Sequence, residues 1–260
     1  MLMKRSMSKM LVVLCLVILS TAVCIASDEV LTQVSTIDAL MTGIYDGTTS
    51  LGELKKNGDL GIGTMNTLDG ELVLLDGIFY QVTSDGKVIR PDLTAKTPFA
   101  VVTFFTADRS IPLRQGSNFQ EFTGNTEKWF PTRNIFYAVK LKGTFKAVKT
   151  RSVPAQKKPY SPLAEIVKTQ PVFEIKNVTG TAVGFWSPSY VKGINVPGYH
   201  LHFISSDGTA GGHILDFVTE NVTAEFDDTR ELSLMLPNDN DFDKADLDRD
   251  RAVELKAVEK

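Results

Sequence analysis

Residues 198–214 read GYHLHFISSDGTAGGHI, and this is the most informative segment of the chain. Large apolar side chains alternate with histidines from Tyr199 to Phe203, which is the period-2 pattern of a strand with two different faces. The glycine-rich residues 207–212 then suit a hairpin turn. The stretch therefore predicts two antiparallel strands, with His213 returning to the level of His202 on the neighbouring strand.

Similar strand signals occur on both sides of this hairpin. Short apolar or alternating runs are separated by turn pairs such as Asp76-Gly77 and by prolines. The expected strands cover residues 71–75, 78–82, 87–89, 98–106, 134–148, 172–186, 198–205, 212–219 and 222–236. The expected helices are short, except for the charged tail, and cover residues 35–41, 50–58, 162–168 and 241–260.

The N-terminal segment predicts a signal peptide. A basic start is followed by an apolar run over residues 10–25 and by small residues around Ala26, where we expect cleavage. A membrane anchor is the alternative, but the run is shorter than the roughly 20 apolar residues that span a bilayer. A lipoprotein acylated on Cys24 is the other alternative, although Thr21 and Val23 do not fit such a signal. We expect an exported protein, secreted or periplasmic, with no stable membrane span after processing.

The remaining elements predict an α+β fold that is predominantly β, with two close-packed β-sheet layers or domains and short flanking helices. The second layer is expected to be an antiparallel sheet or small barrel that carries the histidines. A proline-punctuated basic connection at residues 151–160 favours a boundary there. The expected organisation is a signal peptide at 1–26, an N-terminal β-sheet domain at 27–150 and a C-terminal β domain with its tail at 151–260.

Composition excludes several classes of function. The chain has 260 residues, of which 43% are hydrophobic and 23% charged, and its formal net charge is -3, so we expect a globular protein with no nucleic-acid partner. Both cysteines, Cys15 and Cys24, lie in the predicted signal peptide. The mature protein would then have no thiol for catalysis, disulfides or metal binding, so any metal must be held by nitrogen and oxygen ligands.

The histidines predict a metal site. His200 and His202 point to the same face of a strand, and the hairpin brings His213 beside them. Three neutral imidazoles at this spacing can bind a divalent ion and leave open positions for water or substrate, as in catalytic sites. Zinc is the default ion, and iron, manganese, copper and nickel remain open. The alternative is a cluster of three ordinary polar strand residues.

Several stretches carry a resemblance to a known family. The chain resembles the acetolactate decarboxylases across essentially the whole predicted mature protein. The matching stretches are STIDALM at 35–41, GDLGIGT at 58–64, LDGE at 68–71, FYAVK at 136–140, GTF at 143–145, RSVP at 151–154, PGYHLHF at 197–203 and GGH at 211–213. They occur in one order along the chain, which makes the match specific.

The resemblance implies a function and a set of site residues. It implies a homodimeric enzyme that decarboxylates (S)-2-acetolactate to (R)-acetoin, with zinc on the three histidines and no organic cofactor. It also implies roles for Glu71 and Arg151, and for a second glutamate near the C-terminus, Glu259 or alternatively Glu254. Zinc would stabilise an enediolate, Arg151 would hold the carboxylate or that enediolate, and one glutamate would deliver a proton.

Other interpretations follow from the residues alone. Glu71 would ordinarily be a solvated residue at a strand start, and Arg151 one charge in a basic linker. A different hydrolase or lyase could use the same three histidines, with Glu71 activating a metal-bound water. A non-catalytic exported protein that binds a metal or a small ligand is the third possibility.

Overall fold

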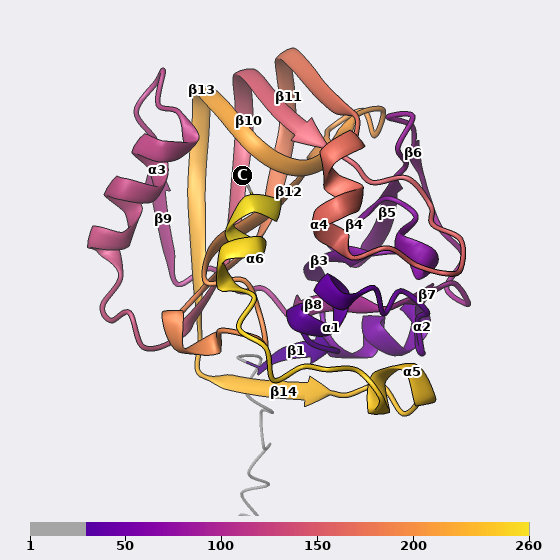
Figure 1. The fold of residues 1–260 in the computed structure, drawn as a ribbon. Helices are drawn as coiled ribbons and strands as arrows, with labels where there is room; N and C mark the ends of the chain where they lie inside the picture. The colour runs from indigo at the N-terminus through magenta and orange to yellow at the C-terminus, as the bar shows by residue number, and fades with distance from the viewer. Residues whose placement is uncertain (1–29, 260) are drawn as a thin grey trace, which may run out of the picture.

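The computed structural model describes residues 30–259, and its two main sheets pack against each other (Figure 1). A seven-stranded sheet has the order β14-β1-β8-β3-β4-β5-β6, and a five-stranded sheet has the order β10-β11-β12-β13-β9. Strands β2 (Thr49–Ser50) and β7 (Lys96–Thr97) form a separate small pair. The predominantly β fold with short helices is thereby confirmed.

The seven-stranded sheet contains most of the N-terminal half. Its strands are β14 (Glu231–Met235), β1 (Val30–Val34), β8 (Phe99–Thr103), β3 (Leu60–Thr64), β4 (Glu71–Leu75), β5 (Ile78–Val82) and β6 (Val88–Ile89). Asp76 and Gly77 both have positive φ, 49° and 74°, so a two-residue hairpin turn joins β4 to β5. The predicted bounds of these two strands are confirmed.

The five-stranded sheet closes on itself. Its strands are β10 (Phe136–Arg151), β11 (Val172–Ser187), β12 (Gly198–Ser205), β13 (Gly211–Thr229) and β9 (Arg109–Pro112). Strand β10 pairs with β11 on one side and β13 on the other, and β12 pairs with both β11 and β13. These pairings form a closed ring of antiparallel strands, so the predicted small barrel is present.

The helices cover the sheets and connect them. They are α1 (Ile37–Thr42), α2 (Leu51–Leu54), α3 (Phe119–Thr126), α4 (Leu163–Ile166), α5 (Asn240–Asp243) and α6 (Ala252–Val258). Short 3-10 turns follow three of them, namely Lys55–Asn57, Glu127–Trp129 and Val167–Thr169. Thr36 caps α1, and Ser50 with Glu53 forms a capping box on α2, as their spacing predicts. Helix α6 lies in front of the barrel, and its C-terminal end points toward the strands (Figure 1).

The core lies between the two sheets. One cluster of buried side chains joins Ile62 and Val101 of the seven-stranded sheet to Ala138, Val183 and Ile204 of the barrel. A second cluster occupies the other face of the barrel strands, where they pack against α3. Because residues alternate along β12, Leu201 and Phe203 face the second cluster while the histidines face the seven-stranded sheet.

Two predictions about the C-terminal half are wrong in detail. The predicted strands 212–219 and 222–236 are divided differently. Residues 211–229 form one strand, β13, because a bulge at Glu220 absorbs the polar residues: Phe145 pairs with Thr219 and Thr144 with Asn221. Residues 231–235 form β14, which leaves the barrel and pairs with β1 in the other sheet. The tail 241–260 is not one helix. Residues 244–251 are non-helical, since Asp246 and Asp250 accept hydrogen bonds from backbone N–H groups two residues on, which competes with helix formation.

The two sheets do not follow the predicted boundary at residue 151. Strands β9 and β10, from the first segment, belong to the barrel, and β14, from the second, pairs in parallel with β1 in the seven-stranded sheet. The division into domains stays a prediction. Within residues 30–259, no helix is long and apolar enough to cross a membrane. The predicted signal peptide and both cysteines lie outside the described residues.

Candidate metal centre

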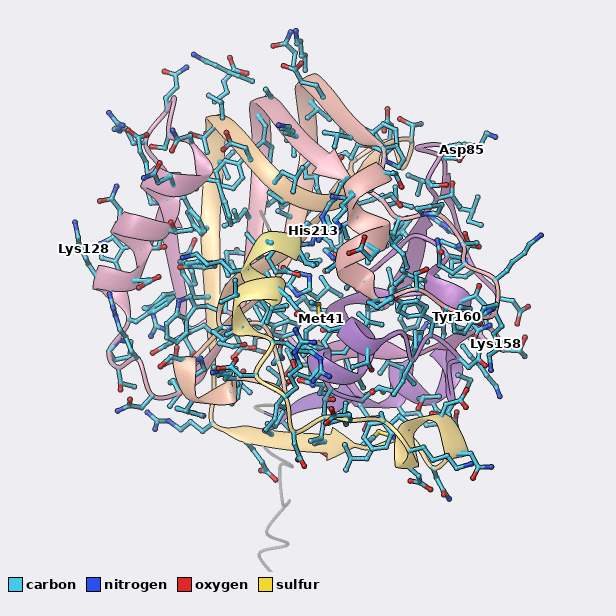
Figure 2. The ribbon with its side chains drawn as sticks, in the orientation of Figure 1. Met41, Asp85, Lys128, Lys158, Tyr160 and His213 are labelled. Carbon is cyan, nitrogen blue, oxygen red and sulfur yellow. The ribbon has the colours of Figure 1, made fainter. Side chains whose placement is uncertain are left out.

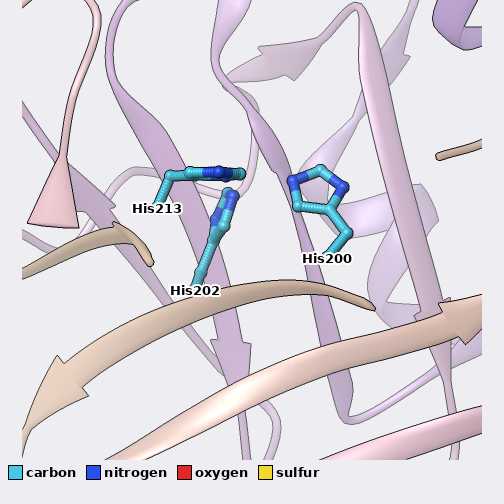
Figure 3. Close-up of side chains that lie close together, drawn as sticks. All are labelled: His200, His202 and His213. Carbon is cyan, nitrogen blue, oxygen red and sulfur yellow. The ribbon is translucent and has the colours of Figure 1, made fainter. Parts of the chain in front are cut away.

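The three histidines converge between the sheets. His200 and His202 lie on β12, and His213 on β13 pairs directly with His202, as the hairpin pattern predicts. The ring centroids are 5.0 to 5.4 Å apart, and one nitrogen from each ring lies within 4.8 Å of the others. Figure 3 shows the three rings directed toward one another. All three residues are buried, and Figure 2 places His213 near the middle of the molecule.

A glycine allows the strands to approach at this point. Gly212 has a φ of +127°, and a Cβ atom there would lie 2.5 Å from the carbonyl oxygen of Arg151. A side chain would therefore overlap the neighbouring strand β10. The next residue, His213, pairs with Arg151 on β10 as well as with His202 on β12. The three side chains form a row across adjacent strands.

His202 is oriented by the other sheet. Its Nδ1 atom lies 2.9 Å from the carbonyl oxygen of Leu72 on β4, so Nδ1–H donates to that oxygen. The Nε2 atom then carries a lone pair, and it is buried with no hydrogen-bond partner. The Nδ1 atom of His200 is also buried and unpartnered. Unpartnered buried nitrogens are costly unless something binds them.

The electrostatic environment keeps the imidazoles neutral. Burial, together with the nearby positive charge of Arg151, lowers the pKa of His200 to about 3. Burial likewise holds the pKa values of His202 and His213 well below the usual range. A neutral imidazole is the form that binds metals. The three side chains therefore fit a divalent ion by their chemistry and spacing, and the unpartnered nitrogens of His200 and His202 add to this fit.

Two carboxylates and a guanidinium surround the histidines. The Oε2 atom of Glu71 lies 3.5 Å from Nε2 of His202. The Oε2 atom of Glu259 lies 3.9 Å from Nε2 of His200 and 3.8 Å from Nε2 of His213. Nitrogens of Arg151 lie 3.9 Å from Glu71 and 3.9 Å from Glu259, which is ion-pair distance but too long for a hydrogen bond.

These residues come from distant parts of the chain. Glu71 is the first residue of β4, Arg151 is the last of β10, and Glu259 directly follows α6. All six residues singled out in the sequence therefore meet in one place. Glu254, the alternative to Glu259, instead pairs with Arg249 near the surface. The structure thus places Glu259, and not Glu254, beside the histidines.

Burial also changes the ionisation of the carboxyl groups. It raises the pKa of Glu71 to about 7, with Arg151 opposing the shift and Glu259 adding to it. Burial raises the pKa of Glu259 to about 7 as well, again opposed by Arg151. Either carboxyl group can therefore hold a proton near neutral pH, which is the property of a general acid or base.

The charged groups line a small cavity whose other walls are mostly apolar. Apart from the histidines, Glu71, Arg151 and Glu259, it is lined by Ile37, Leu40, Gly63, Thr64, Leu68, Phe99, Val153, Leu163 and Val258. Arg151 is the only lysine or arginine in this lining. The cavity thus suits a small molecule that combines apolar groups with one anionic group.

Sequence reasoning missed two contacts in this region. The Leu72 carbonyl that orients His202 is a backbone group, which no residue pattern reveals. Gln170 accepts a hydrogen bond of 2.9 Å from Nη1 of Arg151. It lies between the predicted helix 162–168 and the next strand, where a polar residue is ordinary and gives no signal of its own.

Comparison with known proteins identifies the family. The family model described as alpha-acetolactate decarboxylase matches residues 31–249. The chain belongs to the alpha-acetolactate decarboxylase family. The matched region contains Glu71, Arg151 and the three histidines and ends before Glu259. The chain is accordingly an enzyme of the carboxy-lyase class, as the resemblance implied.

Individual members of the alpha-acetolactate decarboxylase family match most of the chain. One from Methanosarcina mazei is 48% identical over 234 residues, which make up 90% of this chain and 81% of the relative. One from Bacillus subtilis strain 168 is 45% identical over 228 residues, or 87% and 89% of the two chains. A crystal structure of alpha-acetolactate decarboxylase from that strain superposes with a TM-score of 0.87 at 44% identity and covers 88% of this chain and 99% of the other.

Proposed function

We propose that this protein catalyses the zinc-dependent decarboxylation of (S)-2-acetolactate to (R)-acetoin and carbon dioxide. The observation that carries the proposal is the meeting of three buried, neutral histidines with Glu71, Glu259 and Arg151 around one cavity. The chain's membership of the alpha-acetolactate decarboxylase family supports the choice of substrate.

His200, His202 and His213 would hold the metal. Three nitrogen ligands without thiolates suit zinc, and three protein ligands leave coordination positions for substrate. When bound, zinc supplies a Lewis acid that stabilises negative charge developing on a substrate oxygen. The Leu72 carbonyl fixes the tautomer of His202, so that its Nε2 presents a lone pair to the site.

Arg151 would bind the carboxylate of the substrate. It is the only cationic side chain in the cavity lining, and its own side chain is only 5% exposed. Its guanidinium presents donors in a planar fork that matches a carboxylate. Because little water competes in a buried site, this contact would fix the orientation of the substrate strongly.

The proposed reaction then needs one proton. The bond between the carboxylate carbon and C2 breaks, carbon dioxide leaves, and the electron pair moves onto the former ketone oxygen as an enediolate. A proton added to C2 completes acetoin, and the side from which it arrives sets the configuration. Glu71 and Glu259 both lie beside the histidines and have a pKa of about 7, so either can donate that proton.

The deciding experiment combines metal analysis with an activity assay. The chain from residue 27 is purified, its zinc content is measured, and acetoin formation from racemic acetolactate is followed with and without a chelator. We expect about one zinc per chain, because there is one histidine cluster. We also expect acetoin formation that stops on chelation and returns with zinc. A zinc-loaded protein that forms no acetoin from acetolactate would overturn the proposal.

We also propose export and dimerisation, which rest on the sequence alone. The basic, apolar and small-residue pattern of residues 1–26 supports cleavage near Ala26. N-terminal sequencing of the protein recovered outside the cytoplasm tests this, and an intact Met1 there would contradict it. A homodimer is the common assembly of soluble enzymes, and light scattering of the mature protein would distinguish it from a monomer.

A further inference from the structure

The guanidinium of Arg151 has a single hydrogen-bond acceptor among the described residues. Its Nη1 donates to Oε1 of Gln170 over 2.9 Å, whereas the carboxylates of Glu71 and Glu259 lie 3.9 Å away. The buried Nε atom has no hydrogen-bond partner. Gln170 therefore fixes one nitrogen of the guanidinium, and the remaining N–H groups are available to bind a ligand.

Backbone contacts hold Gln170 in this place. The ladder between β10 and β11 ends with the pair Arg151 and Val172, so the residues just before Val172 run beside Arg151. The N–H of Ser152 donates to the carbonyl of Pro171 over 3.3 Å, and the N–H of Gln170 donates to that of Val167. These hydrogen bonds fix the backbone on both sides of Gln170. They thereby hold its side-chain amide beside Arg151.

The chemistry of the amide suits this position. Arg151 already lies at ion-pair distance from two carboxylates, and a third would compete further with an anionic ligand. A neutral amide oxygen accepts a hydrogen bond without adding negative charge. Gln170 can therefore fix the rotamer of Arg151 and leave its positive charge available.

We propose that Gln170 is a positioning residue that orients Arg151 toward the carboxylate of the substrate. The inference rests on the proposed function, in which Arg151 binds that carboxylate. Gln170 itself touches the guanidinium and not the reacting atoms. Since a hydrogen bond to a charged group is lost when the acceptor is removed, the affinity for a carboxylate ligand should fall roughly 10-fold.

The test is the zinc-loaded chain with Gln170→Leu, which removes the acceptor at similar size. Two inhibitors are compared: 2,3-dihydroxy-2-methylbutanoate, which has the carboxylate but no ketone and cannot lose carbon dioxide in the same way, and acetoin, which lacks the carboxylate. We expect the inhibition constant of the carboxylate compound to rise roughly 10-fold and that of acetoin to stay within about twofold. The KM for acetolactate should rise by a similar factor while kcat changes little. Gln120→Leu, on the exposed side of α3, is the matched control.

The other outcomes overturn the inference. Equal weakening of both inhibitors, or loss of zinc, would show that Gln170 only supports the local fold. Unchanged inhibition by the carboxylate compound would show that Arg151 does not depend on it. If Gln170→Leu does not fold, Gln170→Met repeats the comparison with an unbranched side chain. Failure of the proposed function is seen separately, because wild-type protein would then form no acetoin whatever the variants bind.

Discussion

The Nδ1 atom of His202 lies 2.9 Å from the carbonyl oxygen of Leu72. This contact joins the barrel to the seven-stranded sheet through β12 and β4. Strand β4 also begins with Glu71, whose carboxylate lies 3.5 Å from the same imidazole. One strand therefore orients a histidine with its backbone and supplies a carboxylate with its side chain. The site therefore forms only when the two sheets pack correctly.

Replacing His202 by alanine should abolish both metal binding and activity. The substitution removes one of three nitrogen ligands. Mutating a residue that only hydrogen-bonds to a metal ligand typically lowers metal affinity roughly 10- to 100-fold, so the loss of zinc affinity here should be larger. Metal analysis and the acetoin assay measure the two effects together. Lys128→Ala, at an exposed position at the periphery in Figure 2, should leave both unchanged. A His202→Ala protein with full zinc content would contradict the ligand assignment.

Replacing Glu259 by glutamine should lower kcat and leave zinc bound. The amide keeps the size of the side chain but cannot deliver a proton, and general acid help of this kind is worth about 100- to 10,000-fold. Glu254→Gln is the matched control, because Glu254 pairs with Arg249 away from the histidines. The same substitution at Glu71 and the enantiomeric composition of the acetoin show which carboxyl group protonates. Equal activity of the Glu254 and Glu259 variants would argue against a role for Glu259.

Replacing Arg151 by lysine should raise the KM for acetolactate by about 10- to 100-fold. Lysine keeps the positive charge but loses the planar fork and therefore a charge-assisted hydrogen bond. Steady-state kinetics measure the effect, and Arg114→Lys on the exposed surface serves as the control. If Arg151→Lys binds the substrate as well as wild type, charge alone explains the role of this residue.

Replacing Gly212 by alanine should destabilise the protein more than the same change at Gly116. Both glycines have positive φ, +127° and +81°, so both variants carry backbone strain of about 1–3 kcal/mol. Only at Gly212 would the new Cβ atom overlap another strand, 2.5 Å from the Arg151 carbonyl, whereas no atom lies within 4 Å at Gly116. Urea unfolding measures the difference. If the two variants lose the same free energy of unfolding, β13 and β10 can move apart at little energetic cost.

Removing the metal should lower the melting temperature. An ion that binds only the folded chain stabilises it by about 4 kcal/mol when its free concentration is a thousand times its Kd. For a chain of this size that corresponds to roughly 8 to 16 °C. Calorimetry with zinc, with chelator and after zinc is restored measures the shift. An unchanged melting temperature, together with bound zinc, would indicate that the ion also binds the unfolded chain.

The sequence predicted those parts of the site that depend on local spacing. The alternation around His200 and the hairpin before His213 were sufficient to predict that the three imidazoles converge. Glu71, Arg151 and Glu259 were assigned only through the family resemblance, because each is locally an ordinary charged residue and becomes part of the site only when the two sheets pack. The bulge at Glu220 was missed since a polar pair in a strand looks like a turn.

The position of Glu259 at the end of α6 has a practical consequence. The segment that leads to it, residues 244–251, is non-helical and largely exposed, and the ion pair between Lys192 and Asp250 that ties it to the body of the protein also lies at the surface. A protease that cuts there would break the covalent link between Glu259 and the rest of the protein, so that only the packing of Leu255 and Val258 would hold it, and would leave all three histidines in place. Under the proposed function, such a clipped protein would still bind zinc, so the zinc content of an aged preparation would overstate the number of working enzyme molecules.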